Sequence, residues 1–501
     1  MKLKLSKLAV LAASVMAVGC LSSCGGDKGG SGGLIINFWH TFGKTPADAV
    51  EAQARKFEKL IKEKEGVDLS IKFTYKGGYT DMVGLVTKSF ATSDNPTICV
   101  AYPDHVADYF AAETGNKKFV VNMESLANDA TIGFGKEAFL GDEEGIDDFV
   151  EAFIDEGRQY SKQGLYSLPY MKSSEVMFYN MTALRRAMPG YGSAIGKDLS
   201  SDTQIKNYMD TLTWDTFMDL CEYVLENKDS IINTLTVPCF YDSDGNFIIS
   251  KIMQNNIKFS SIDASGNGVL DFNGHATERF TPSASQTENY NKVIDLLEDL
   301  KEDFDKGLFT TKGVFGQYGS NEFTSQHTIF SIGSSGGAGY NFPSSDTFEV
   351  GICCVPESNN NPLYVSQGPS LCLLNNYKVS NEDNDKMVKY AWKFLKYITN
   401  KEVNAALTVN GSEGYIPVRE SAYETDTFLN FMEDGENYAK TASTVIYDID
   451  GHYLNTAVFS GSAALRENIA AALADTLNFT KSGLSAQQAL DKAIEETILK
   501  M

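Results

Sequence analysis

The chain has 501 residues, with 43 Lys and Arg against 66 Asp and Glu, so its formal net charge is -23 and its pI is ≈ 4.7. A chain of this length is too long for a single hydrophobic core, because domains cluster at roughly 100–200 residues, so two or more lobes are expected. A hydrophobic content of 43% excludes a disordered chain. The acidic excess argues against nucleic acid or any polyanion as a partner, although a local cationic site could still hold one small anion.

The first residues predict export. Lys2, Lys4 and Lys7 precede an apolar run over 8–18 and a small-residue stretch, which is the pattern of a secretory signal peptide over 1–23. The apolar run is far shorter than the roughly 20 residues that cross a bilayer, so a permanent membrane helix is not expected.

A lipid anchor is predicted at the end of this leader. Residues 21–24, Leu-Ser-Ser-Cys, resemble a bacterial lipobox, in which Cys24 becomes the first mature residue and is acylated. Cys20 is the alternative. Residues 24–33 are rich in Gly and Ser, a composition typical of a flexible tether.

Metal and cofactor chemistry finds no support in the sequence. The remaining cysteines form no Cys-x-x-Cys pair, and the histidines form no His-Glu-x-x-His helix. We expect buried free thiols, with a disulfide left open for an exported protein. These cysteines are Cys99, Cys221, Cys239, Cys353, Cys354 and Cys372.

The first part of the mature chain alternates between strand and helix patterns. Buried or alternating apolar runs predict strands over 34–38, 67–75 and 97–102. Helical spacing predicts helices from Pro46 to a stop at Gly66 and over 82–90. This βαβαβ order predicts a parallel sheet with helices on its faces and ligands at the carboxyl ends of the strands.

The rest of the chain continues the α/β pattern with longer insertions. Helices are predicted over 213–226, 289–305 and 387–399, and from a capping box at Ser485. Residues 259–288 are rich in Ser, Gly, Asn and Thr and indicate a surface excursion. The acidic segment 242–246 lacks the glycine spacing and closing Glu of a calcium loop, so a hairpin turn is predicted there.

A Gly-x-Ser-x-Gly string over 333–337 raises the possibility of a secreted serine hydrolase that uses Ser335. Such an elbow needs a helix directly after the serine. Gly339 and Pro343 disfavour a helix there, and His452 is the one downstream histidine that could serve as a base. The string favours instead a small-residue loop that a polar ligand can approach closely.

Longer strings resemble a known family. Residues 168–180 (LPYMKSSEVMFYN) are similar to the hinge-crossing segment of family 1 extracellular solute-binding proteins of ABC importers. Residues 213–217, 391–395 and 414–418 are similar to further signatures of that family, in the same order. The resemblance covers essentially the whole mature chain.

The resemblance implies an α/β, two-lobed periplasmic-binding-protein-like fold of type II, with two discontinuous lobes, a hinge and a ligand cleft between the lobes. One lobe would comprise 34–168 and 363–400, and the other 169–362 and 401–501. The implied protein is a monomeric, non-enzymatic receptor without cofactors. It would deliver a solute to ABC permease subunits and be held at the outer face of the cell membrane by its lipid alone.

Within the family the chain most resembles the sn-glycerol-3-phosphate-binding receptors, through residues 38–40 and 74–79. This likeness implies glycerol-3-phosphate or a glycerophosphodiester as ligand, and the alternative is a neutral mono- or oligosaccharide. Where those receptors place a Glu that binds glycerol hydroxyls, this chain has Asp104 in a shifted position. Matching motifs imply these further ligand contacts, of which Arg466 would hold the phosphate: Tyr79, Ser173, Ser334, Gly368, Tyr415 and Arg466. Trp39 and Trp214 are candidates for stacking on a sugar ring.

Overall fold

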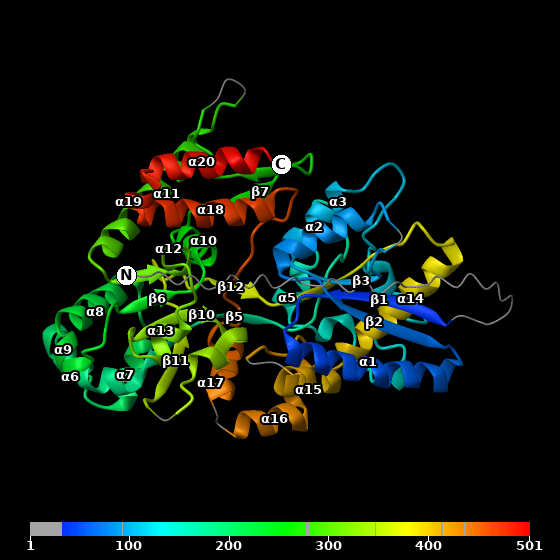
Figure 1. The fold of residues 1–501 in the computed structure, drawn as a ribbon, viewed down its shortest axis with the longest axis horizontal. Coiled ribbons are helices and arrows are strands. Elements are labelled where there is room, and N and C mark those ends of the chain that lie inside the picture. Colours follow the sequence, from blue (N-terminus) through cyan, green and yellow to red (C-terminus); the bar gives the residue numbers. More distant parts are fainter. Residues whose placement is uncertain (1–32, 93, 277–279, 346, 412–413, 435–436) are drawn as a thin grey trace, which may run out of the picture. The chain divides into compact units, whose positions relative to one another are not determined.

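In the computed structural model, alternating helices and strands build two mixed β-sheets from residues 34–501 (Figure 1). The structure describes residues 33–501 except 93, 277–279, 346, 412–413 and 435–436. The predicted signal peptide, Cys24, Cys20 and all but the last residue of the predicted tether lie outside the described residues. Within these residues, every helix is too short or too polar to span a lipid bilayer.

The first sheet confirms the predicted βαβαβ start. Strand β1 runs parallel to β2, with Leu34 opposite Leu69, and parallel to β3 on its other side. Strand β13 then pairs antiparallel with both β3 and β4, so a later part of the chain returns to this sheet. In sheet order the strands are β2 (Leu69–Tyr75), β1 (Leu34–His40), β3 (Ile98–Ala101), β13 (Ser370–Leu373) and β4 (Leu168–Pro169).

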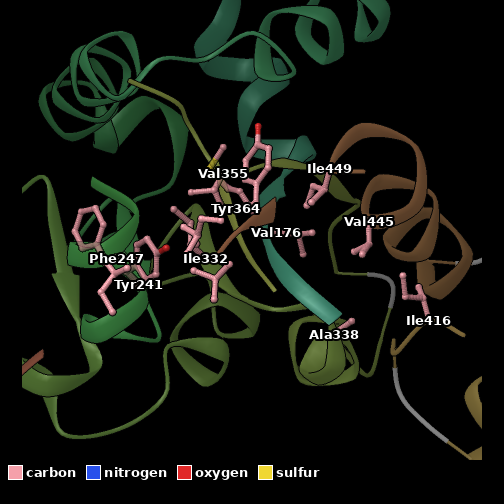
Figure 2. Packing of buried hydrophobic residues seen from close by; sticks show 14 of the residues in the cluster. Val176, Tyr241, Phe247, Ile332, Ala338, Val355, Tyr364, Ile416, Val445 and Ile449 are labelled. Carbon is pink, nitrogen blue, oxygen red and sulfur yellow. The ribbon is translucent and has the colours of Figure 1, made fainter. Parts of the chain in front are cut away.

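The second sheet is organised by β5, whose eight residues are all buried. One edge of β5 pairs with β10, and the other pairs first with β12 and then with β11. The strands are β14 (Tyr453–Leu454), β12 (Tyr364–Gln367), β5 (Ser173–Asn180), β10 (Phe330–Ser334), β6 (Cys239–Tyr241), β9 (Phe309–Thr311) and β11 (Val350–Cys354). Figure 2 shows Val176 of β5, Ile332 of β10 and Tyr241 of β6 in the buried apolar layer of this sheet.

Helices cover both sheets. On the first sheet, α1 buries Val50, Ala54, Phe57 and Ile61, and Gly66 ends the helix in the left-handed conformation, as predicted. The helices associated with this sheet are α1 (Lys44–Glu65), α2 (Tyr79–Ser89), α3 (Pro103–Ala111), α4 (Glu124–Ala127), α5 (Glu151–Glu156), α14 (Asn381–Ile398) and α15 (Lys401–Gly411), with short 3-10 turns η1 (Ala138–Leu140) and η2 (Ile146–Asp148).

Around the second sheet, α10, α11 and α20 all pack against α18 (Figure 1). The capping box predicted at Ser485 opens α20. The remaining helices are α6 (Met181–Ile195), α7 (Asp202–Met209), α8 (Trp214–Glu226), α9 (Lys228–Ile231), α10 (Asp244–Gln254), α11 (Ala284–Asp305), α12 (Lys312–Phe315), α13 (Ser320–Thr324), α16 (Asp426–Glu433), α17 (Asn437–Ser443), α18 (Ser462–Leu477), α19 (Phe479–Ser482) and α20 (Ala486–Ile498). Turns η3 (Ser335–Asn341) and η4 (Glu420–Glu424) are 3-10, and η5 (Thr444–Asp448) is a π-helix.

Two local predictions are wrong. The predicted hairpin at 242–246 is a strand-to-helix junction, because the Ser243 hydroxyl accepts from the backbone of Asn246 and caps α10. The carboxylate of Asp242 accepts from the backbone of Gly319, and that of Asp244 from Thr311, so both acids tie the junction to neighbouring segments. The loop after Ser334 forms η3, where no helix was predicted. It consists of 3-10 turns interrupted at Gly337, whose φ of -110° and ψ of 18° are not helical, so it is not the α-helix that a hydrolase elbow needs.

The surface excursion predicted over 259–288 contains a short hairpin of β7 (Ser260–Ile262) and β8 (Gly268–Leu270).

The lobe boundaries stay a prediction. Two segments lie with the other sheet than the predicted ranges assign them to: α15 packs against α1, whereas β12 pairs with β5. Both lie beside the points where the chain crosses between the sheets.

A network of buried charges fixes the segment 133–148 beneath α14. The ammonium group of Lys396 is fully buried and donates to Glu137, Asp142 and the carbonyl of Gly133 at 2.8, 2.9 and 3.0 Å. Lys393, one helical turn before Lys396, contacts Glu137 at 2.6 Å. Burial raises the pKa of Asp142, and Lys396 opposes that rise. The network therefore depends on Lys396.

Removing the Lys396 charge should destabilise the protein strongly. Lys396→Met leaves Glu137 and Asp142 as buried carboxylates without their shared cation, a loss worth about 3–5 kcal/mol. The matched control is Lys386→Met on the same helix, where the lysine forms an exposed pair with Glu382 and its loss should change stability little. Thermal unfolding measures both. Equal melting temperatures for the two variants would contradict this account of the network.

Candidate ligand-binding cavity

A cavity of ≈ 280 Å³ lies where elements of the two sheets approach each other. Its walls come from the start of α3 on the side of the first sheet, and from α10, the end of β12 and the start of α18 on the side of the second. The polar and aromatic side chains on these walls are Tyr79, Tyr102, Asp104, His105, Glu156, Gln159, Asn246, Phe259, Ser260, Ser366, Gln367, Asn455, Thr456, Ser462, Arg466 and Glu467.

Helices α3 and α18 meet directly at this cavity. The guanidinium Nε of Arg466 lies 3.8 Å from the carboxylate of Asp104. One helical turn on, burial raises the pKa of Asp108, and the backbone N–H of Gly461 next to that carboxylate opposes the rise. Val458 pairs with Tyr160 in an isolated parallel bridge and packs in the same apolar cluster. Elements associated with both sheets therefore contribute residues to one cavity.

Arg466 projects from α18 into the cavity wall, with 36% of its side chain exposed. Its Nη1 donates to Asn246 Oδ1 at 2.9 Å. Asn246 Nδ2 in turn donates to the buried carboxylate of Glu175, at 3.0 Å. The arginine predicted from the sequence as an anion site is thus held from behind by two residues that sequence reasoning did not select.

Several polar atoms of the cavity wall have no hydrogen-bond partner among the described residues. They are the hydroxyl oxygens of Ser260 and Ser366 and the amide oxygen of Gln367, all buried. Buried polar atoms are nearly always paired, so each such atom calls for an explanation, and a bound polar solute supplies one. Sequence reasoning missed Ser366 and Gln367, although both directly precede the predicted contact Gly368.

The aromatic wall is formed by two tyrosines on the side of the first sheet. The rings of Tyr79 and Tyr102 lie 4.4 Å apart, at an interplanar angle of 41°. Burial raises the pKa of both hydroxyls, so both stay protonated and can donate hydrogen bonds at neutral pH. Tyr79 was predicted from the Lys-Gly-x-Tyr string, whereas Tyr102 was not.

The other predicted contacts form a second group at the strand crossing. Ser334 Oγ donates to Ser173 Oγ at 3.2 Å, and a Cβ added to Gly336 would lie 2.7 Å from the Tyr415 ring. Burial raises the pKa of Tyr415, with a further contribution from nearby Tyr79. This group does not line the ≈ 280 Å³ cavity, but Tyr415 and Tyr79 lie close enough to interact.

Gly368 lies at a close approach of two backbones. Its φ is 99°, and a Cβ there would lie 2.3 Å from the carbonyl oxygen of Met171. Only glycine fits this crossing without strain. The position therefore holds β12 and β13 against the hinge-crossing segment, which places Ser366 and Gln367 at the cavity.

Neither tryptophan lines the cavity. Trp39 is 4% exposed and carries the Lys76 ammonium over its ring, and Trp214 is 2% exposed. The indole N–H of Trp214 donates to Gln254 inside the core of the second sheet. Both rings serve packing in this structure, and stacking on a ligand ring stays untested.

Neither a serine-hydrolase centre nor a metal site is formed in the described part of the chain. The buried Ser335 hydroxyl accepts from the backbone of Ser174 at 3.3 Å, and the structure pairs it with no histidine there. No group of three or more His, Cys, Asp or Glu that could hold a metal ion occurs among those residues. The six cysteines downstream of the leader are free thiols, five of them buried.

The sequence model for bacterial extracellular solute-binding proteins matches residues 52–438. The chain belongs to this family. The family's members are substrate-binding proteins of ABC transporters rather than enzymes, so the serine-hydrolase hypothesis is wrong and this protein is an exported solute receptor of an ABC importer. Its expected partners are a small-molecule solute and the permease. No curated protein matches the chain.

Solved structures place the receptor in the two-lobed α/β fold. It is similar to UgpB of Mycobacterium tuberculosis in complex with glycerophosphocholine, with 16% identity, a TM-score of 0.61, and coverage of 94% of this chain and 98% of that one. For the cyclic α-maltosyl-1,6-maltose binding protein of Arthrobacter globiformis these values are 16%, 0.62, 93% and 98%. For the sugar-binding protein MalE of Xanthomonas citri they are 12%, 0.63, 93% and 97%. The two-lobed fold predicted from the sequence is confirmed.

Stability should respond to pH through Glu175, because burial raises the pKa of this receptor's carboxyl to about 7. Between the unfolded pKa near 4.5 and about 7 the folded state binds more protons, so the free energy of unfolding falls as pH rises through that window. Glu175→Gln cannot ionise. The free energy of unfolding of Glu175→Gln minus that of wild type should therefore be larger at pH 8 than at pH 5, by about 2.5 kcal/mol.

Thermal unfolding at pH 5 and pH 8 measures this difference. The matched control is the exposed Glu298→Gln, which should differ from wild type equally at the two pH values. A Glu175→Gln variant that also differs equally at both would show that the carboxyl does not titrate in this window.

Proposed function

We propose that this receptor captures a glycerophosphodiester and delivers it to its ABC permease. The observation that carries the proposal is the placement of Arg466 on the wall of a cavity that is also lined by residues whose buried hydroxyl and amide oxygens have no hydrogen-bond partner among the described residues. An arginine can hold the phosphate, while the neighbouring oxygens bind the hydroxyl groups of glycerol.

Arg466 retains donors for an anion. Asn246 uses Nη1, and the 3.8 Å separation from Asp104 exceeds the roughly 2.7–2.9 Å of a charge-assisted hydrogen bond. The guanidinium fork can therefore meet a phosphate with two parallel N–H groups, which lysine could not provide. Asp104 then becomes available for a glycerol hydroxyl, in the role the sequence comparison suggested for it.

Local charge favours a monoanion over a dianion. The carboxylates of Asp104, Glu156 and Glu467 all line the cavity, and Glu156 is paired with the buried Lys172. A phosphodiester brings one negative charge to Arg466, whereas glycerol-3-phosphate brings nearly two close to these acids. A diester whose second substituent is cationic would also suit the acidic wall and the tyrosine pair.

Capture would couple the two sides of the cavity. A ligand bound between α3 and α18 favours the arrangement in which these helices meet, by as much as its affinity differs between open and closed forms. We propose further that the receptor acts as a monomer and that Cys24, or alternatively Cys20, carries the lipid that holds it at the cell surface.

A neutral mono- or oligosaccharide is the second candidate. The observation that favours it is the pairing of Arg466 with Asp104, which balances the arginine without a ligand anion. Sugar hydroxyls could then bind Ser366, Gln367 and Asn246, with the Tyr79 ring against the sugar face. Under this alternative, Arg466 serves mainly to close the cavity.

A thermal-shift panel on the purified mature domain separates the candidates. The panel contains glycerophosphocholine, sn-glycerol-3-phosphate and maltose. We expect glycerophosphocholine at 100 times its Kd to stabilise the protein by about 2.7 kcal/mol, with a smaller effect from the dianion. Arg466→Ala should weaken diester binding at least about a hundredfold, since losing a charged partner costs roughly 3 kcal/mol.

The control is Arg185→Ala. Arg185 has nearly the same side-chain exposure, 37%, and pairs with Asp202 and Glu349. The variant should bind as wild type does. Stabilisation by maltose that survives Arg466→Ala would move the assignment to the neutral sugar. No response to any class of ligand would reject both candidates.

A further inference from the structure

A chain of hydrogen bonds runs from the buried interior to the arginine of the cavity. Glu175 Oε1 accepts from Asn246 Nδ2 at 3.0 Å, and Asn246 Oδ1 accepts from Arg466 Nη1 at 2.9 Å. Glu175 is 3% exposed and lies on β5, whereas Asn246 belongs to α10 and Arg466 to α18. One strand and two helices on the side of the second sheet therefore contribute to a hydrogen-bond chain that ends in the cavity.

The order of groups in this line is determined by their chemistry. A carboxylate only accepts and a guanidinium only donates, whereas an amide has one end of each kind. With Glu175 behind it, the amide of Asn246 must direct its NH₂ inward and its oxygen toward Arg466. The opposite orientation would place NH₂ against guanidinium, with two donors facing each other. The carboxylate thus selects the orientation of the amide.

Glu175 is itself held rigidly. Its Oε2 accepts from the Tyr241 hydroxyl at 2.5 Å. The Tyr241 ring stacks on Phe247, with centroids 4.4 Å apart and an interplanar angle of 16°, and Figure 2 shows these two rings side by side. Glu175 also lies opposite Ser334 in the pairing of β5 with β10. The strand pairing holds the backbone of Glu175 and the Tyr241 hydroxyl holds its carboxylate, so Glu175 offers Asn246 an acceptor in a fixed position.

We propose that Glu175 is the positioning residue for Arg466: it fixes the Asn246 amide, which holds the guanidinium at the cavity wall, and its ionisation tunes how strongly that arginine attracts an anionic ligand. The proposal rests on the proposed function, since it takes Arg466 as the ligand's anchor. Glu175 itself does not line the cavity and acts through the other two residues.

The electrostatic part of the proposal has a defined sign. The groups facing Glu175 are Tyr241 and Asp242 from β6 and its end, Asn246 from α10, Ser334 from β10 and Arg466 from α18. Ionised Glu175 partly offsets the charge of Arg466. With the pKa of Glu175 near 7, lowering the pH protonates this carboxyl and leaves the arginine freer to attract a phosphate. Affinity for an anion should therefore rise as pH falls.

The test measures the affinity for glycerophosphocholine by calorimetry from pH 6 to pH 8.5, a range in which its phosphodiester does not titrate. The ratio of the wild-type affinity at pH 6 to that at pH 8.5 should exceed the same ratio for Glu175→Gln by up to about tenfold. Glu175→Gln keeps an oxygen for Asn246 and should show at pH 8.5 the affinity of wild type at pH 6. All ionisable groups other than residue 175 are present in both proteins, so this comparison isolates the effect of Glu175.

The positioning part is tested by removing the acceptor. Glu175→Ala should lose at least about tenfold in affinity at pH 6, where charge no longer differs from wild type, and Glu175→Gln should restore it. Asn246→Ala should lose as much, and the double variant no more, because both act through one line. Additive losses, or full affinity in Glu175→Ala, would overturn the proposal.

Two outcomes separate this proposal from the proposed function. If wild type binds no ligand of the panel, the proposed function fails, and a crystal structure of Glu175→Ala still tests the positioning role. An Arg466 guanidinium displaced from Asn246 Oδ1 supports it, and an unchanged guanidinium contradicts it. If Glu175→Ala does not fold, the coupling is measured with Glu175→Gln and Asn246→Ala.

Discussion

The structure depends on the close crossing of the backbone segments that pass between the two sheets. Residues Lys172 and Ile416 exchange both backbone hydrogen bonds, at 3.1 and 2.7 Å, so the segment between β4 and β5 is paired before the second sheet begins. Gly368 fits against the same segment because it has no Cβ. This crossing sets where β5 and β12 start, and hence which groups at the end of β12 line the cavity and which groups of β5 lie behind it.

This crossing also determines the positions of the polar groups in the cavity wall and behind it. At the end of β12, the Ser366 hydroxyl and the Gln367 amide oxygen have no hydrogen-bond partner among the described residues, while β5 buries Glu175 beside Tyr241. Because water is excluded around them, these groups interact more strongly than they would at a surface, and unpaired ones are costly. A receptor can use that cost, since a solute that supplies the missing partners recovers it on binding. The general negative charge of the chain has little part in this, because screening limits it to about 8 Å.

The sequence predicted the fold well where local pattern and global structure agree. The start of the chain, the helix ending at Gly66 and the capping box at Ser485 follow from spacing and cap chemistry. The junction at 242–246 was mispredicted because its acids bind Gly319 and Thr311, which lie far away in the chain. A strand-to-helix junction and a hairpin turn use the same residues locally, so only tertiary contacts distinguish them.

The site was predicted in part. Motif likeness selected Tyr79 and Arg466, and a departure from the motif selected Asp104; these three residues line one cavity. Trp214, a candidate for stacking on a sugar ring, is buried in a core. A sequence pattern does not show which distant side chains form hydrogen bonds with each other in the fold. Nothing adjacent to Glu175 in the chain shows that it supports Asn246, 71 residues on.

A crystal structure of the receptor with glycerophosphocholine tests the central claim most directly. The account predicts phosphate oxygens within hydrogen-bond distance of the Arg466 guanidinium, with glycerol hydroxyls at Ser366, Gln367 or Asp104. A ligand bound away from this cavity, or a phosphate that makes no contact with Arg466, would contradict it.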